Sequence, residues 1–316
     1  MTKIVVLDGA SVNRGDLSWA DFKTLGALCV YENLKKEDVV ASIGDSEIVL
    51  TNKVVIDKTV LDACPSIKYI GVLATGYNTI DLAYAAEKDI VVTNIPAYST
   101  ESVVQHVFAL LLEYCSRVGY HDLRVKAGAW EASELFGFWD YPIQELSGKT
   151  LGIVGLGQIG TGVAKVANAF GMMVLGNART PKTMEGVTFV SLEELYQEAD
   201  IVTLHCPLTA ETKGMINKNT IGTMKEGAIL INTGRGPLVV EDDVASALDT
   251  GKLAAYLADV FSSEPPKPGS RLLYHPKTII TPHYAWAPKE ARTRLLQIAH
   301  DNIVAFLEGV PKNQVN

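Results

Sequence analysis

The stretch that decides the fold is Leu151–Gly160, which reads LGIVGLGQIG. Its first four residues suit a buried strand, and the Ala-rich run that follows, as far as Phe170, has helical spacing. Between strand and helix lie Gly155, Gly157 and Gly160, spaced as G-x-G-x-x-G. In such a turn the first glycine allows the sharp bend, the second lets a ligand approach the backbone, and the third lets helix and strand pack closely. The stretch therefore predicts a strand–turn–helix unit of a parallel α/β sheet.

A glycine turn at a helix N-terminus suits a phosphate group, because free backbone N–H groups and the helix dipole both favour an anion there. The pattern alone is often an ordinary turn. Here a strand precedes it, a helix follows it, and a further strand is predicted at Met172–Leu175, which together favour the pyrophosphate of a dinucleotide. The residues expected to bind it are Gly155, Gly157, Gln158, Ile159 and Gly160.

Short β-branched runs alternate with amphipathic stretches on both sides of this turn, a rhythm that indicates parallel sheets covered by helices. Before it, strands are predicted at Ile4–Leu7, Cys29–Tyr31, Glu47–Thr51, Tyr69–Leu73 and Ile90–Thr93. From Thr150 onward they are predicted at Thr150–Val154, Met172–Leu175, Ile201–Leu204, Ala228–Asn232, Ala255–Leu257 and Thr278–Ile280. The sequence therefore predicts an α/β protein of two Rossmann-like domains.

The domain boundaries follow from two helices. Apolar spacing predicts one long helix from Ser99 to Tyr120, leading out of the first lobe. A last helix, about Pro288–Glu308, has no strand of its own and is expected to cover the first lobe. The first domain is then discontinuous, comprising residues 1–98 and 289–316, and the dinucleotide-binding domain comprises residues 99–288.

Composition excludes several classes of function. The net charge of −8 argues against nucleic acid, whose binding depends on clustered Lys and Arg. The four cysteines have neither C-x-x-C pairs nor neighbouring His at ligand spacing, so we expect no metal site and no disulfide framework. No apolar stretch has the length of a membrane span, and we expect a cytoplasmic protein.

The loop after the strand at Met172–Leu175 bears on the choice of cofactor. An NAD-preferring site usually has an acidic side chain there, which binds the ribose hydroxyl. This chain has Ala178 instead, followed by Arg179, Thr180 and Lys182, which could bind a 2′-phosphate. A basic loop is also common on an ordinary surface. The sequence predicts NAD(P) as cofactor, with NADP(H) favoured over NAD(H).

Three segments at strand ends carry candidates for hydride transfer to a ketone, which needs a proton donor and an anchor for the substrate. They read NTGRGP at 232–237, ADVFSSEPP at 258–266 and TPHYAW at 281–286. Arg235 could hold a keto oxygen and a carboxylate with its planar fork, although a surface arginine is the plain alternative. His283 could move a proton, although a histidine between Pro and Tyr is usually structural. Ligands of open α/β sheets bind at the carboxyl ends of the strands, where these segments should converge.

These segments, together with the glycine turn, resemble the signatures of the D-isomer-specific 2-hydroxyacid dehydrogenase family along almost the whole chain. The run GVLATGYN at 71–78 resembles the family's substrate-carboxylate loop, and NIPAYSTESV at 94–103 resembles its hinge. The resemblance implies a flavodoxin-like substrate-binding domain at 1–98 plus 289–316, with the active site in the cleft between the two domains. It also implies a homodimer that acts on a small 2-keto or D-2-hydroxy acid.

The resemblance assigns a role to each candidate. Arg235 matches the arginine that orients the substrate, His283 the proton donor and acceptor, and Glu264 its acidic partner. A carboxylate beside an imidazolium stabilises the protonated form and so keeps the acid available for ketone reduction. The implied substrate-binding residues are Ala74, Thr75, Gly76, Arg235 and His283. The implied cofactor-binding residues are Thr75, Gly155, Gly157, Gln158, Ile159, Gly160, Ala178, Arg179, Thr180, Cys206, Pro207, Thr233, Gly234, Asp259, His283 and Ala285.

Two residues depart from the family pattern, Ala178 where an acid is usual and Gln105 where the hinge helix more often has Glu. Within the family, the segments at 73–78, 94–100 and 138–142 are most similar to glycerate dehydrogenases, also called hydroxypyruvate reductases. The expected reaction is reduction of hydroxypyruvate or glyoxylate to D-glycerate or glycolate. D-lactate and phosphoglycerate remain alternatives, although Arg is absent from residues 69–78.

Two questions stay open at this point. A cofactor-sensing protein that kept the fold and lost turnover is the alternative from a different class. The aromatic segment Phe136–Tyr141 could belong to the core, cap a substrate or contact a second subunit.

Overall fold

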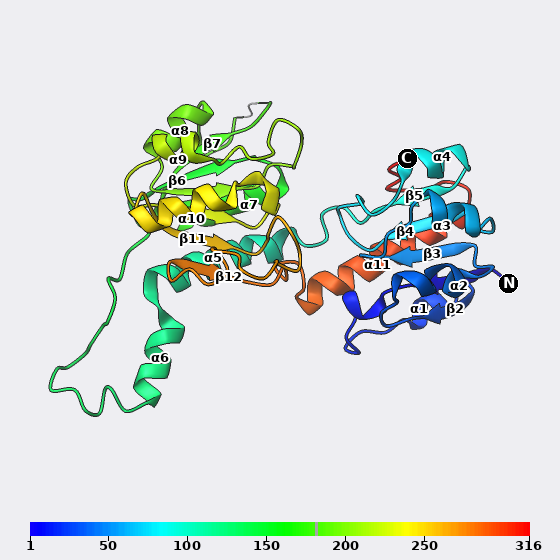
Figure 1. Ribbon diagram of the computed structural model, residues 1–316, viewed down its shortest axis with the longest axis horizontal. Helices are drawn as coiled ribbons and strands as arrows, with labels where there is room; N and C mark the ends of the chain where they lie inside the picture. The colour runs from blue at the N-terminus through cyan, green and yellow to red at the C-terminus, as the bar shows by residue number, and fades with distance from the viewer. Residues whose placement is uncertain (181–182) are drawn as a thin grey trace. The chain divides into compact units, whose positions relative to one another are not determined.

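A computed structural model describes residues 1–180 and 183–316, and the chain divides into two compact units. Unit 1 comprises Met1–Ser99 and Trp286–Asn316, and unit 2 comprises Thr100–Ala285. Each unit contains one parallel sheet, labelled by element in Figure 1. Within the described ranges, no helix has both the length and the apolar character that crossing a bilayer requires.

The sheet of unit 1 has the strand order β2-β1-β3-β4-β5, which is the order of flavodoxin-like sheets. Its strands are β1 (Lys3–Val6), β2 (Ala27–Val30), β3 (Ile48–Thr51), β4 (Tyr69–Val72) and β5 (Val91–Thr93). All residues of β3 and β4 are buried because helices cover both faces of the sheet.

Helices α1 (Ala20–Lys23) and α11 (Lys289–Leu307) pack on one face of this sheet, and α2 (Val39–Ile43), α3 (Lys58–Ala63) and α4 (Leu82–Glu87) pack on the other. The long helix α11 shares a core with Ile48 and Tyr69 through Leu295 and Ile303. The expectation that the last helix covers the first lobe is therefore confirmed. Beyond α11, Gln314 pairs antiparallel with Thr93 at the edge of the sheet.

The sheet of unit 2 has the order β12-β11-β10-β9-β6-β7-β8. Its strands are β6 (Thr150–Val154), β7 (Met173–Asn177), β8 (Thr188–Phe189), β9 (Ile201–Leu204), β10 (Ala228–Asn232), β11 (Leu253–Ala258) and β12 (Thr278–Ile280). The chain reverses its direction of travel across the sheet at β6, which has β7 on one side and β9 on the other. Ligands of such sheets bind at the carboxyl ends of the strands at this switch point.

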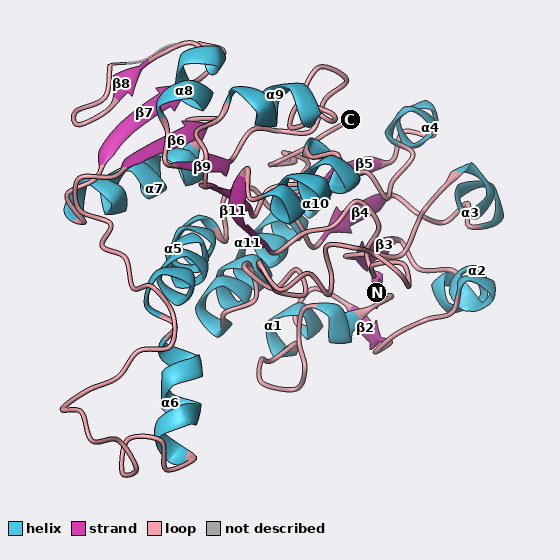
Figure 2. Cartoon of the chain, turned by 60° about the vertical axis from the view of Figure 1, so that its left-hand side comes forward, coloured by secondary structure: helices cyan, strands magenta, loops and turns pink. Residues whose placement is uncertain are grey.

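Helices α5 (Thr100–Ser116) and α7 (Gln158–Ala169) cover one face of this sheet, and α8 (Leu192–Glu198), α9 (Lys218–Thr223) and α10 (Glu241–Thr250) cover the other. Figure 2 shows α7 and α8 with strands β6, β7 and β9 between them. Neighbouring residues of one strand serve opposite cores, as Ile153 and Val154 do. The prediction of two Rossmann-like parallel sheets is confirmed, while the short strand β8 was not expected.

The helix expected from Ser99 to Tyr120 is interrupted. It ends at Ser116, because Arg117 adopts a left-handed conformation with φ of 50° and a second helix, α6 (Val118–Lys126), begins there. Residues 118–143, here called the extension, stand away from the sheet of unit 2 (Figure 1). Phe136 is fully exposed and Trp139 is 68% exposed, so the aromatic segment is not part of a core.

Candidate functional site

The glycine turn between β6 and α7 has the geometry of a phosphate site. Gly155 has φ of 97°, and a Cβ placed there would lie 2.6 Å from the backbone nitrogen of Cys206. A Cβ at Gly160 would lie 2.0 Å from the carbonyl oxygen of Gly155. Packing therefore requires glycine at both positions. A Cβ at Gly157, by contrast, would meet no described atom within 4 Å.

The second glycine thus leaves open space in front of the first turn of α7, where a pyrophosphate would approach. Gly157 is the residue before this helix, and no side chain among the described residues caps the helix at that point. The first turn contains no acidic residue, so its N–H groups and dipole can act on an anion. The predicted residues Gln158 and Ile159 supply the first of these N–H groups, and the turn fits a dinucleotide.

The end of β7 presents the residues expected at the adenosine ribose. Ala178 is half-buried, and Arg179 and Thr180 are exposed. Lys182 lies outside the described residues. A hydrogen bond from Thr209 is the main cause that holds the pKa of Glu211 below its usual value, and the positive field of Arg179 adds to it. An acidic side chain that sequence reasoning did not name therefore lies within electrostatic reach of Arg179.

The ends of β9 and β10 bring further predicted cofactor residues to the same edge of the sheet. Cys206 and Pro207 follow β9, and Gly155 lies close to the backbone of Cys206. The hydroxyl of Thr233, just after β10, is buried and has no hydrogen-bond partner among the described residues. A buried hydroxyl without a partner costs free energy unless a ligand or water bonds to it. The neighbouring Gly234 donates its N–H to the side chain of Asn232.

Arg235 follows the carboxyl end of β10, and its side chain is exposed. Its Nη1 atom lies 2.8 Å from the carbonyl oxygen of Gly234. The next residue, Gly236, lies directly against the loop that leads to Glu264. A Cβ at Gly236 would lie only 1.9 Å from the carbonyl carbon of Phe261. The glycine after the arginine therefore lets the loop of Arg235 touch the loop of Glu264.

Glu264 and His283 form a close pair. The Oε2 atom of Glu264 lies 2.6 Å from Nδ1 of His283, and its Oε1 accepts the backbone N–H of Phe261 at 2.9 Å. The side chains are 37% and 30% exposed, so both are accessible to a small molecule. His283 has φ of 50°, an uncommon conformation for a residue other than glycine, of the kind that clusters at functional sites.

Asp259 anchors the segment that carries His283. This carboxylate is 1% exposed and accepts hydrogen bonds from the hydroxyl of Thr281 at 2.6 Å, the N–H of Tyr284 at 3.0 Å and the N–H of Ala285 at 2.9 Å. These donors lie on both sides of His283. We expected Asp259 and Ala285 to contact the cofactor. In the structure they bond to each other and so help to hold the segment that carries His283.

One side chain beside this loop was missed. His106 of α5 has its Nε2 atom 2.9 Å from the hydroxyl oxygen of Thr281 and 3.6 Å from Asp259. Its ring also contacts the ring of Tyr284 edge to face, with centroids 5.1 Å apart. In the sequence, the only sign of this role is a histidine next to Val107 in a segment with helical apolar spacing. The prediction of an apolar helix gave that histidine no role.

The predicted substrate loop, Ala74 to Gly76, belongs to unit 1 and follows β4. The hydroxyl of Thr75 donates to the carbonyl oxygen of Ile95 at 2.8 Å, and the amide of Asn94 donates to the carbonyl oxygen of Thr75 at 2.8 Å. These bonds fix the loop against the end of β5. In the described part of the chain, no residue accepts from the backbone N–H groups of Ala74, Thr75 and Gly76, which can therefore receive an anion.

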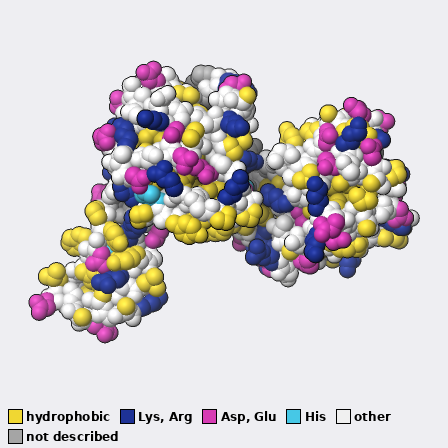
Figure 3. Space-filling model, viewed as in Figure 1, with side chains coloured by type: hydrophobic (Ala, Val, Ile, Leu, Met, Phe, Trp, Pro, Cys, Tyr) yellow, Lys and Arg dark blue, Asp and Glu magenta, His cyan; other side chains and the backbone are white. Residues whose placement is uncertain are grey.

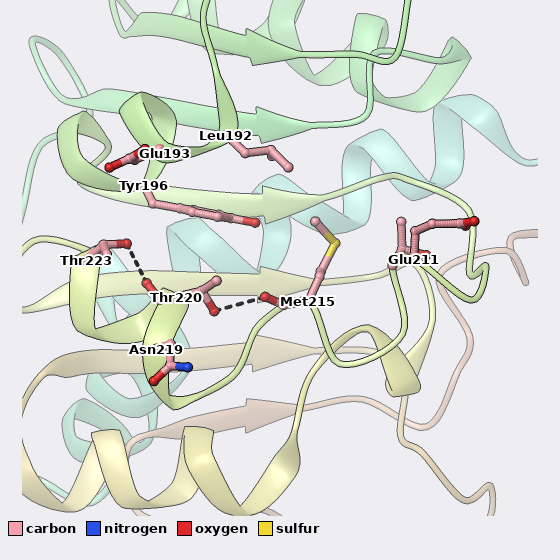
Figure 4. Close-up of a pocket in the computed structure, with 9 residues that line it drawn as sticks. Leu192, Glu193, Tyr196, Glu211, Met215, Asn219, Thr220 and Thr223 are labelled. Carbon is pink, nitrogen blue, oxygen red and sulfur yellow. Dashed lines mark hydrogen bonds between the residues drawn. The ribbon is translucent and has the colours of Figure 1, made fainter.

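A cavity of about 530 Å³ lies on the α8 and α9 side of unit 2, and Figure 4 shows the side chains that line it. It is lined by Leu192, Glu193, Tyr196, Glu211, Thr212, Met215, Asn219, Thr220 and Thr223. None of the residues predicted for the site is among them. One of its lining residues is Glu211, whose carboxylate lies within electrostatic reach of Arg179.

Comparison with known proteins agrees with this geometry. The family description "D-isomer specific 2-hydroxyacid dehydrogenase, NAD binding domain" matches residues 108–285. A hydroxypyruvate reductase of Blautia hydrogenotrophica is 48% identical over 99% of each chain, and a glycerate dehydrogenase of Methylorubrum extorquens is 38% identical over 99% of this chain and 98% of its own. The TT0316 protein of Thermus thermophilus superimposes with a TM-score of 0.89 at 35% identity over 100% of both chains. The chain belongs to the D-isomer specific 2-hydroxyacid dehydrogenase family, whose members are NAD(P)-dependent oxidoreductases.

Proposed function

We propose that this enzyme reduces hydroxypyruvate to D-glycerate with NAD(P)H, and that it reduces glyoxylate to glycolate as a second reaction. The relative with 48% identity is named a hydroxypyruvate reductase, and that likeness extends over 99% of both chains. The observation that carries the chemistry is the pair of Glu264 and His283, 2.6 Å apart beside the loop of Arg235.

Each residue has a distinct part in the proposed reaction. The guanidinium of Arg235 holds the keto oxygen and the carboxylate of the substrate and polarises the carbonyl. His283, protonated and held at Nδ1 by Glu264, donates the proton from Nε2 to the oxygen of the nascent alkoxide. The N–H groups of Ala74, Thr75 and Gly76 hold the carboxylate, so unit 1 serves as the substrate-binding domain. The bound nicotinamide supplies the hydride.

The cofactor is held by unit 2 in this proposal. The pyrophosphate lies against Gly157 and the first turn of α7, where a Cβ would have open space. The hydroxyl of Thr233 and the backbone of Cys206 and Pro207 lie along the dinucleotide, which gives the buried hydroxyl a partner. Asp259 and Ala285 are expected at the nicotinamide end.

A panel of 2-keto acids tests the substrate, with hydroxypyruvate, glyoxylate, pyruvate and phosphohydroxypyruvate each measured with NADH and with NADPH. We expect the highest kcat/KM with hydroxypyruvate. A higher value with pyruvate or with the phosphorylated acid would replace the proposal by the corresponding D-lactate or phosphoglycerate activity. The control is His283→Asn, which should bind NAD(P)H normally and reduce none of the acids. Binding of NAD(P)H by the wild type without turnover of any acid would favour the sensing alternative.

We propose further that the enzyme prefers NADP(H). Ala178 has no carboxylate to bind the ribose hydroxyls or to repel a 2′-phosphate, and Arg179 beside it is exposed and positively charged. Glu211 opposes this preference, because its carboxylate lies within electrostatic reach of Arg179. The preference is therefore expected to be moderate.

The extension supports a homodimer, which we also propose. Its helix and loop bond to each other through Tyr120, which donates to Asp140 at 2.8 Å, and through Arg124, which pairs with the same carboxylate at 3.0 Å. Large apolar side chains stay exposed all the same, among them Leu123, Trp130, Leu135, Phe136, Trp139 and Ile143. Apolar side chains are visible over the extension in Figure 3. The extension is held together by its own hydrogen bonds and still exposes an apolar surface. Such a surface is suited to pack against the same surface of a second copy of the chain.

Sedimentation of Phe136→Ser/Trp139→Ser, compared with the wild type at equal concentration, tests the dimer. We expect a dimer for the wild type and a monomer for the double variant, whose circular dichroism spectrum should still be that of a folded protein. A monomeric wild type, or a dimeric variant, would contradict this role of the extension. The control is Tyr274→Ser, which removes another exposed aromatic residue outside the extension.

A further inference from the structure

His106 reaches the catalytic loop from a different element of unit 2. It lies in α5, and its side chain is 11% exposed. Its Nε2 atom is 2.9 Å from the hydroxyl oxygen of Thr281, two residues before His283, and its ring contacts Tyr284, one residue after it. A single helix side chain therefore touches both flanks of the residue that is proposed to move the proton.

The direction of each hydrogen bond follows from the donors available. A carboxylate and a carbonyl only accept, and of these two the carboxylate of Asp259, 2.6 Å away, is much closer to the hydroxyl of Thr281 than the carbonyl oxygen of Ala258, 3.4 Å away, so the hydroxyl gives its one proton to Asp259. The hydroxyl oxygen can then only accept from His106, 2.9 Å away. The proton of a neutral His106 must therefore reside on Nε2. The chain of hydrogen bonds therefore runs from the imidazole of His106 through the hydroxyl of Thr281 to the carboxylate of Asp259.

The state of His106 agrees with this direction. Burial lowers the pKa of His106, and the negative charge of Asp259 only partly opposes that effect. A neutral imidazole has one N–H donor, and here the acceptor next to it is Thr281. The chain of bonds ends on Asp259, which also accepts the N–H groups of Tyr284 and Ala285.

We propose that His106 is a positioning residue, which holds Thr281 and Asp259 so that the loop between them presents His283 to the substrate. Its contacts with Thr281, Asp259 and Tyr284 lie on both sides of His283. Its effect passes through the backbone of the loop, where His283 is held at φ of 50°. The kinetic part of the test rests on the proposed function.

Three variants separate the hydrogen bond from the packing. His106→Phe keeps a ring against Tyr284 but has no donor, His106→Gln keeps an N–H donor, and Thr281→Val removes the acceptor. We expect His106→Phe to lower kcat by about tenfold, the effect of one lost buried hydrogen bond, and Thr281→Val to lower it at least as much, because the valine also removes the bond to Asp259. Both variants should change the Kd of the cofactor by less than about threefold. His106→Gln should recover most of kcat. The double variant His106→Phe/Thr281→Val should be no slower than Thr281→Val, because the valine already removes the bond to His106.

The matched control is His275→Phe. His275 is also largely buried in unit 2, and its Nε2 atom lies 3.2 Å from Asp249, away from the catalytic loop. This variant should keep kcat within about twofold of the wild type even where it lowers the unfolding temperature, because lost stability alone does not misplace His283. Unchanged kcat in His106→Phe, or effects of the two single variants that multiply in the double variant, would overturn the proposal.

A second measurement needs no turnover. Nitrogen-15 spectra of protein labelled at histidine report which ring nitrogen carries the proton, and His106→Gln and His283→Asn assign the two signals. We expect the Nε2–H form for His106, loss of its hydrogen-bond shift in Thr281→Val, and a displaced His283 signal in His106→Phe. An Nδ1–H form, or a His283 signal that is unmoved in His106→Phe, would overturn the proposal. An inactive wild type with the expected spectra would contradict the proposed function alone.

Discussion

The Nδ1 atom of His283 lies 2.6 Å from Oε2 of Glu264, and the other oxygen of the same carboxylate is fixed by the backbone N–H of Phe261. The carboxylate is therefore oriented by its own loop before it bonds to the imidazole. This arrangement fixes the ring and makes Nε2 the atom expected to exchange a proton with the substrate. Gly236 lets the loop of Arg235 pack against the same segment. The positions of the three residues proposed for catalysis therefore depend on contacts between their backbone segments.

Replacing Glu264 by Gln should slow the reaction in both directions. The amide has no negative charge beside the ring, so it stabilises the imidazolium that forms during oxidation of D-glycerate less than the carboxylate does. We expect kcat for reduction of hydroxypyruvate and for oxidation of D-glycerate to fall by about tenfold, the effect of one charge-assisted hydrogen bond, while the Kd of NAD(P)H stays close to that of the wild type. Steady-state kinetics in both directions and fluorescence titration measure these values. A variant as fast as the wild type would show that the pair does not act in catalysis.

Replacing Arg235 by Ala should remove substrate binding and leave cofactor binding intact, because the guanidinium is proposed to contact only the substrate. We expect kcat/KM for hydroxypyruvate to fall by at least about a hundredfold, as for the loss of a bidentate charged contact. Fluorescence titration should give a Kd for NAD(P)H close to that of the wild type. Arg235→Lys should recover little, because an ammonium cannot grip two oxygens side by side. Turnover near that of the wild type would remove Arg235 from the site.

Replacing Gly236 by Ala should disrupt the site without touching a predicted catalytic side chain. A Cβ at this position would lie 1.9 Å from the carbonyl carbon of Phe261, so the loops of Arg235 and Glu264 must move apart. We expect a large loss of kcat and an unfolding free energy lower by about 2 kcal/mol, which is typical of overpacking. The matched control is Gly222→Ala in α9, where a Cβ would meet no described atom within 4 Å and stability should not fall. Equal behaviour of the two variants would contradict this account.

The regular parts of the fold were predictable because apolar runs and glycines carry their own signal. The strand Thr150–Val154 is buried along its whole length and mostly apolar, and it was predicted with the bounds that the structure has. The glycine turn was predictable because Gly155 and Gly160 have no room for a Cβ, while Gly157 leaves the space that a ligand would occupy. Glu264 and His283 were named as partners from motifs, and their atoms lie 2.6 Å apart, while their roles in catalysis stay predictions.

Other features could not be read from the sequence because they depend on tertiary contacts. The break at Arg117 lies inside a continuous helical pattern, and the nearest glycine, Gly119, lies within the next helix and not at the break. His106 is one of several polar residues of α5, and its role becomes visible only when the fold brings Thr281 and Asp259, far along the sequence, beside it. Glu211 and Arg179 are far apart in the sequence, so their mutual electrostatic effect could not be predicted.

The choice of cofactor is the remaining prediction, and the chain departs most from an NAD pattern there. Wild-type kcat/KM should be higher with NADPH than with NADH, and Arg179→Ala should erase a difference of about tenfold, the effect of one charge-assisted hydrogen bond at an exposed site. Ala178→Asp should reverse the preference, because a carboxylate binds the ribose hydroxyls and repels the 2′-phosphate. Glu211→Gln should raise the NADPH preference by about threefold, since it removes a negative charge near Arg179, and added salt should reduce that gain. Steady-state kinetics with both cofactors at fixed ionic strength measures all four proteins. A wild type that prefers NADH, with Arg179→Ala unchanged from it, would show that this loop holds the adenosine ribose without using the arginine.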